Sequence, residues 1–205
     1  MTVPNKDQTA TYEAEREVRT YLELLHGSRV LHQKAGEQIE GSYWLTMSSL
    51  LLTAFTFEAY LNHVGQQKIK FWEEIDTIRV MDKFAVLCKH FDIDQDKSRR
   101  PYQTLVTLFK FRNAVAHGKS QIIKESRIVG ADFDPRFEGP RTQWEEYCTP
   151  ENATRAIDDV SEVLEWLHSH SGIDHHVFIS GMTLSSVSPV RPNYESNQAS
   201  SKKPA

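Results

Sequence analysis

The chain lacks most of the features that mark a metal site, a disulfide framework or a membrane span. Only two of its 205 residues are cysteines, Cys88 and Cys148, and they provide neither a disulfide framework nor the spacing of zinc ligands. The most apolar stretch, about residues 50–64, is interrupted by Glu58 and Asn62, which favours a core helix over a membrane span. We therefore expect a cytoplasmic protein with no metal, no other cofactor and no membrane partner.

An excess of positive charge is also missing from the chain as a whole. Its 24 basic residues face 28 acidic ones, for a net charge of −4, so the whole molecule is not a basic nucleic-acid binder. The segment 97–127 is the exception, because it carries eight Lys or Arg residues and the single acidic residue Glu125. Such a segment attracts a phosphate backbone, although a solvated basic face would have the same composition.

Helical periodicity dominates the rest of the chain. Val18, Tyr21, Leu22 and Leu25 follow the i, i+3, i+4, i+7 spacing and predict a first helix over residues 9–31. Further helices are expected over 42–64, 68–75, 81–91 and 101–117, with Gly118 as a C-terminal cap, and from residue 149 onward. Together these segments predict an all-α protein, a bundle of four or five helices.

Two stretches depart from this pattern. Residues 119–148 contain turn signals and two short β-prone runs, which predict an irregular insertion before the last helix, with room for a hairpin. The end of the chain is rich in Ser, Pro and Asn and predicts disorder. The expected organisation is one helical domain over residues 9–178, with its insertion at 119–148, and a disordered tail over 179–205.

The densest group of chemically useful side chains lies near the end of the fifth expected helix. Arg112, Asn113 and His117 fall within six residues. With ~100° of rotation per residue, Arg112 lies on the apolar arc of the helix, and Asn113 and His117 lie together at its edge. An arginine on a buried arc requires a partner of opposite charge.

The second expected helix offers that partner. Glu58 and Asn62 continue the line of apolar residues along this helix. Two opposite charges on the inner faces of two helices predict a Glu58–Arg112 ion pair with Asn62 nearby. Such a pair is either a structural bridge alone or a support that orients Arg112 toward a phosphate.

These residues resemble the HEPN superfamily. The match consists of Arg112-Asn113-x-x-x-His117, with the family's Arg-x4-His spacing, and of the run from Phe57 to Asn62 on the second helix, and it covers about residues 9–170. The resemblance implies a helical bundle of HEPN type that dimerises through its motif helices. Many members are metal-independent endoribonucleases that act as toxins or defence effectors, whereas others are non-catalytic modules that bind RNA, a nucleotide or a protein.

The resemblance and the chemistry of the side chains together suggest a role for each residue. Arg112, Asn113 and His117 would be catalytic, Glu58 and Asn62 would support them, and Lys110 and Lys119 would contact the RNA backbone. The imidazole of His117 titrates near neutral pH and can act as an acid or a base. The expected partners are RNA, a second copy of the chain and an antitoxin protein. The alternative is a HEPN-like binding or interaction module without catalysis.

Overall fold

The computed structural model describes residues 10–130 and 139–189 and confirms a predominantly helical fold with one small sheet. The described residues form two parts, the helical part Arg19–Ser180 and a two-stranded ribbon. The helices are α1 (Thr20–Glu37), α2 (Ser42–Lys68), α3 (Trp72–Ile75), α4 (Val80–His90), α5 (Tyr102–Ala116), α6 (Gln143–Tyr147) and α7 (Pro150–Ser171). The strands are β1 (Ala10–Arg16) and β2 (Thr183–Pro189).

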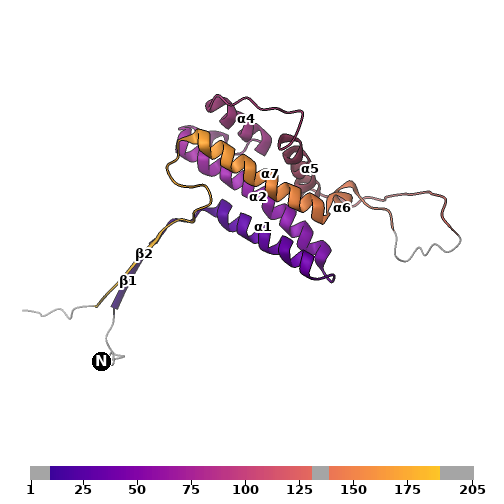
Figure 1. Cartoon of the computed structure of the whole chain (residues 1–205), viewed down its shortest axis with the longest axis horizontal. Coiled ribbons are helices and arrows are strands. Elements are labelled where there is room, and N and C mark those ends of the chain that lie inside the picture. The colour runs from indigo at the N-terminus through magenta and orange to yellow at the C-terminus, as the bar shows by residue number, and fades with distance from the viewer. Residues whose placement is uncertain (1–9, 131–138, 190–205) are drawn as a thin grey trace, which may run out of the picture. The chain divides into compact units, whose positions relative to one another are not determined.

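Helix α2 is the centre of the helical part. It packs against α1, α4, α5 and α7, and Figure 1 shows α1, α2 and α7 side by side. Leu50, Ala54, Phe57, Leu61 and Val64 recur along it at spacings of three and four, and each is fully buried. A helix of 27 residues is about 40 Å long, so its apolar stripe can serve several neighbours at once.

Small and hydroxyl-bearing residues allow α1 to approach α2 closely. At Gly27, an added Cβ would lie 3.0 Å from the side chain of Leu52. At the next residue, the buried Ser28 hydroxyl lies 2.6 Å from that of Thr53, and the Ser49 hydroxyl donates to the Ser28 carbonyl oxygen at 2.9 Å. These bonds satisfy the polar groups that the close contact removes from water.

The connection between α2 and α3 depends on a glycine. The indole of Trp72 lies against the backbone of Gly65, where a Cβ would come within 2.1 Å of the ring. Trp72 is 2% exposed. Only a residue without a side chain leaves room for this ring in the core.

The start of α7 confirms the sequence prediction, whereas α6 was not predicted. Thr149 accepts a hydrogen bond from the Asn152 backbone and Pro150 follows it, as the sequence indicates. Helix α6 lies inside the insertion that we expected to be irregular. It begins with a capping box in which Thr142 and Glu145 bond to each other's backbone N–H, a Thr-x-x-Glu pattern that is visible in the sequence.

The first helix begins later than predicted. Helix α1 starts at Thr20 rather than near residue 9, because residues 10–16 form β1 instead. This segment is rich in Ala, Glu and Arg, which favour a helix, but backbone pairing with β2 overrides that preference. The ribbon is antiparallel, with Ala10 opposite Pro189 and Arg16 opposite Thr183.

The expectation of a disordered tail over 179–205 is wrong for the residues that form β2. Their low apolar content indicated disorder, but a strand needs no buried core where a partner strand satisfies its N–H and C=O groups. Residues 190–205 lie outside the described residues. Between Gly118 and Gly130 the insertion has no regular secondary structure, so the hairpin considered for residues 121–129 does not form. Within the described ranges, no helix combines the length and the apolar character that a membrane span requires.

Candidate functional site

Helix α5 positions the Arg-Asn-x3-His motif at its C-terminal end. Leu105, Leu108 and Phe109 are buried and anchor one face of the helix. The helix ends at Ala116, and the His117 backbone N–H bonds to the Asn113 carbonyl oxygen at 2.9 Å. His117 itself occupies the cap position, so the motif straddles the last turn of the helix and the residue that follows it.

The expectation for the end of α5 is wrong. Gly118 does not adopt the left-handed conformation expected of a capping glycine. Ala116 shares the angular position of the apolar arc but is exposed, because the last turn extends past the neighbouring helices. A helical wheel gives the angle of a residue and not its depth in the bundle.

The predicted ion pair between α2 and α5 is confirmed. The Nη2 of Arg112 donates to Oε2 of Glu58 at 2.8 Å. The two side chains are 22% and 26% exposed, so the pair is shielded but within reach of solvent on one side. The guanidinium also lies over the ring of Phe55, with its central carbon 5.6 Å from the ring centre.

A buried lysine, which the sequence analysis missed, completes the support. The Nζ of Lys83 on α4 donates to Oδ1 of Asn62 at 2.9 Å and lies 4.0 Å from Oε1 of Glu58. Its side chain is 3% exposed. The signal was present in the sequence, because Lys83 falls at i+3 on the apolar stripe that begins at Val80 and continues through Phe84. Asn62 therefore joins the network through Lys83.

The amide of Asn113 is oriented by its neighbour. The Nη1 of Arg112 donates to Oδ1 of Asn113 at 2.9 Å. Because the amide oxygen is occupied in this way, the NH2 group of Asn113 is left to donate elsewhere. Arg112 uses two N–H groups for Glu58 and Asn113, and its Nε has no hydrogen-bond partner in the part of the chain that the structure describes.

The motif residues meet at one cavity of about 650 Å³. Its wall includes Glu58, Lys110, Arg112, Asn113 and His117. The structure thus brings together five of the seven residues singled out in the sequence. The remaining wall comes from the α3–α4 connection and the start of α4, and from the apolar side of α5.

The other two predicted residues lie elsewhere. Asn62 supports the site from behind, and Lys119 is exposed and does not line the cavity. The cavity gains Arg79 and Asp82, which form an ion pair of 2.8 Å. Three cations and two carboxylates are among the described residues that line the cavity. The single imidazole among them is that of His117.

Part of the basic segment 97–127 is neutralised. The guanidinium of Arg100 binds both carboxylate oxygens of the buried Asp159, at 2.6 and 2.9 Å, and these hydrogen bonds, together with the negative charge of Asp159, raise the pKa of Arg100. Arg99 pairs with Asp96 at 2.8 Å. The positive charge that remains available near the motif is therefore more local than the composition of the segment indicates.

The tryptophans differ in their exposure, and none of Trp44, Trp72 and Trp144 lines the motif cavity. Trp144 is half-buried against the core. Trp72 is fully buried, and Trp44 is 62% exposed. Among the described residues no group of His, Cys, Asp or Glu is arranged to hold a metal ion; His168, for example, bonds to the hydroxyl of Tyr60 at 3.1 Å.

Comparison of the chain with protein-family models, with curated proteins and with solved structures gives no significant match. The assignment of a function therefore depends on the site itself.

Proposed function

We propose that the chain is a metal-independent endoribonuclease of HEPN type, acting as a homodimer in the role of a toxin or defence effector. One observation carries the proposal. Arg112 is held by Glu58 at the wall of a cavity that Asn113 and His117 also line. A cation, an amide donor and an imidazole around one cavity can supply the charge stabilisation and the proton transfer that cleavage of an RNA phosphodiester requires.

Arg112 would bind the phosphate. Its contacts to Glu58 and Asn113 use two of its five N–H donors. The Nε–H is buried, but the second N–H of Nη1 and that of Nη2 can donate to the non-bridging oxygens and stabilise the charge that grows on them in the transition state. The NH2 group of Asn113 would add a second kind of donor.

His117 would move the proton. As a base it takes the proton of the ribose 2′-hydroxyl, and the 2′-oxygen then bonds to phosphorus. The bond from phosphorus to the 5′-oxygen breaks, and the leaving oxygen needs a proton from a second group. The products are a 2′,3′-cyclic phosphate and a free 5′-hydroxyl. Side chains carry out both proton transfers, so the proposed reaction needs no metal ion.

A second copy of the chain would supply the second proton. Within the described chain, His117 is the single imidazole at the cavity, and one histidine performs half of an acid–base pair. Ala114 and Ala116 are exposed on the motif helix and leave room for close approach of another α5. This placement supports a composite site with one His117 from each copy.

The test is cleavage of labelled RNA in EDTA by the wild type and by the variants Arg112→Ala and His117→Ala. We expect each variant to lose about 100-fold or more in rate. His26→Ala and Arg155→Ala are matched controls, because both residues are exposed and lie outside the cavity. An RNA with a single 2′-deoxyribose at the cleaved position should resist cleavage, since the nucleophile is missing.

The outcomes separate the alternatives. Cleavage that survives either site substitution would overturn the mechanism. Binding of RNA without cleavage, lost in Arg112→Ala and kept in Arg155→Ala, would instead favour a non-catalytic HEPN-like module. Growth arrest on expression, relieved by His117→Ala, would support a toxin and justify a search for an antitoxin protein.

A further inference from the structure

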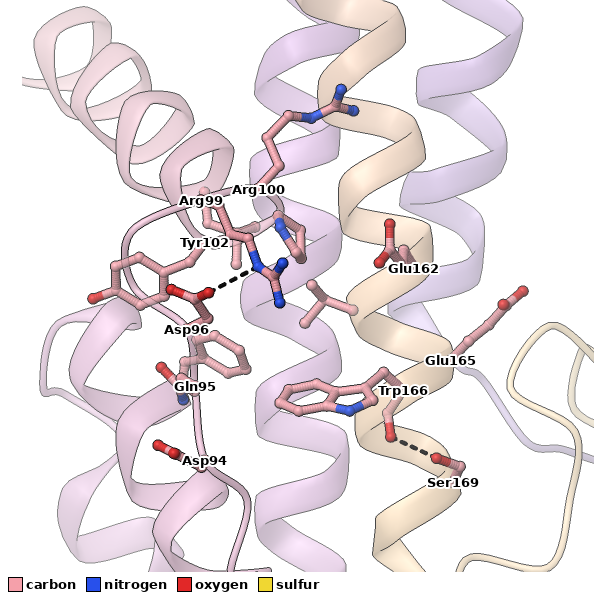
Figure 2. A pocket seen from close by; sticks show the side chains of 14 residues that line it. Asp94, Gln95, Asp96, Arg99, Arg100, Tyr102, Glu162, Glu165, Trp166 and Ser169 are labelled. Atoms are coloured by element: carbon pink, nitrogen blue, oxygen red, sulfur yellow. Dashed lines mark hydrogen bonds and ion pairs between the residues drawn. The ribbon is translucent and has the colours of Figure 1, made fainter.

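A second cavity of about 730 Å³ lies between α7 and the connection from α4 to α5. Its floor is apolar, because Phe84, Leu105 and Val163 are buried beneath it. Figure 2 shows the indole of Trp166 reaching from α7 into this space, with Asp94 and Asp96 on the connection opposite. The volume falls in the range typical of pockets for small molecules, about 300–1,000 Å³.

The charges around this cavity are predominantly negative. Four carboxylates line it, against two guanidiniums. Both guanidiniums are already held, Arg99 by Asp96 and Arg100 by Asp159. Among the described residues, the exposed carboxylates of Asp94, Glu162 and Glu165 form no ion pair within 4.0 Å, although the charge of Glu162 acts on Arg100.

The two cavities therefore differ in the ligands they favour. Tyr102 contributes to the wall of both. On the motif side the cations are in excess, whereas on this side the carboxylates are. A phosphate is attracted to the first cavity and repelled from the second, which attracts a cation.

The placement of the carboxylates indicates the shape of that cation. Asp94 lies on the connection between α4 and α5, and Glu162 lies on α7, on the other side of the cavity, whereas Glu165 points away from the indole (Figure 2). A ligand that meets both walls needs a positive group at each end. Its middle crosses the apolar floor and the indole, so methylene groups suit it, and the face of Trp166 can attract an ammonium.

We propose that this cavity binds a linear diamine or polyamine. The terminal ammonium groups pair with Asp94 on one wall and with Glu162 on the other, and the methylene chain lies over the floor formed by Phe84, Leu105 and Val163. A single ammonium group would satisfy one wall only. This inference is independent of RNA cleavage, because neither the motif residues nor the cavity that they line takes part.

The experiment is calorimetric titration of the full chain with spermidine and with 1,8-diaminooctane. We expect both amines to bind and 1,8-octanediol, which has the same methylene chain without charge, not to bind. The variant Asp94→Asn/Glu162→Gln should weaken spermidine binding about fivefold, the order expected for two partly exposed charge pairs. Trp166→Leu should weaken it as well, through loss of the cation–π contact.

The matched control removes two carboxylates from another surface. Glu73→Gln/Glu74→Gln on the exposed side of α3 makes the same change in net charge and should leave binding unchanged. Equal weakening in both double variants would overturn the proposal, because it would reveal general attraction to an acidic protein. Binding of a trilysine peptide without binding of either amine would overturn it too. Circular dichroism of each variant establishes that the fold is retained.

Discussion

At the scale of single residues, the carboxylate of Glu58 interacts with two cations, Lys83 and Arg112. Lys83 is almost fully buried, and the other two are about one-quarter exposed. Buried charges are costly unless they are paired. Glu58 thus compensates two cations at once, and this makes it the most sensitive member of the site for stability as well as for orientation of Arg112.

Substitution Glu58→Gln tests this role. It leaves Lys83 and Arg112 close together without an anion, and we expect a loss of about 2 kcal/mol in the free energy of unfolding, less than for a fully buried pair because solvent reaches one side. Adding Lys83→Met should recover part of the loss, since it removes one of the uncompensated charges. Urea denaturation of the two single variants and the double variant measures this coupling, and strictly additive effects would contradict it.

The two thiols give a prediction on pH. Burial raises the pKa of both Cys88 and Cys148 from 9.0 to about 11. The folded chain keeps these protons to a higher pH than the unfolded chain, so their stabilisation is complete below pH ~9 and is lost as the pH rises toward 11. Both thiols should be unreactive toward a disulfide reagent at pH 8 in the native protein and reactive in urea.

Removing the thiols should flatten the alkaline side of the stability profile. Between pH 9 and 11, the variant Cys88→Ala/Cys148→Ala is expected to lose less stability than the wild type, by on the order of 4 kcal/mol, about 2 kcal/mol for each thiol. Chemical denaturation at several pH values provides the comparison. Parallel profiles for the two proteins would show that the thiols titrate alike in the folded and unfolded chain.

At the scale of elements, the packing of α3 on α2 depends on the absence of one methyl group. A Cβ at Gly65 would overlap the indole of Trp72, with contacts of 2.1–2.5 Å. We expect Gly65→Ala to destabilise the protein by about 3 kcal/mol, at the upper end for an overpacked core. Gly36→Ala is the control, because nothing lies within 4 Å of its added Cβ and alanine favours a helix. Thermal denaturation should move the two variants in opposite directions.

Secondary structure was predictable where the local pattern and the packing agree. Helices α2, α4, α5 and α7 follow from apolar periodicity, and the Thr149-Pro150 start of α7 follows from capping chemistry. The Glu58–Arg112 pair followed from the same periodicity, because both charges fall on apolar stripes. The burial of Lys83 could have been predicted in the same way, because Lys83 is a charged residue on the apolar stripe of α4.

At the scale of the whole molecule, the ribbon joins segments from the two ends of the described chain. Residues 10–16 are exposed along their whole length, so the ribbon depends on backbone pairing and on cross-strand pairs such as Tyr12 with Val187. Gly181 lies directly before it, where a Cβ would come within 2.3 Å of the Glu17 carbonyl oxygen.

Gly181→Val should therefore disrupt the ribbon without affecting the helices. We expect the amides of β1 and β2 to lose protection from hydrogen exchange, and the free energy of unfolding of the helical part to change by less than ~0.5 kcal/mol. Gly139→Val is the control, because its added Cβ meets nothing within 4 Å. Loss of protection in α2 or α7 would show instead that the ribbon and the helices unfold together.

The helical character of the chain and the position of the motif at the end of a helix follow from the sequence alone, because they depend on the angular spacing of residues within a helix. The pairing of Glu58 with Arg112 follows as well, since each charge falls on the apolar stripe of its own helix. The tertiary structure decided what depends on distance between segments. It paired residues 10–16 with residues 183–189, buried Lys83 beside Asn62, left Lys119 outside the cavity and neutralised Arg100 with Asp159. Periodicity specifies which way a side chain faces, whereas its partners depend on which segments the fold brings together.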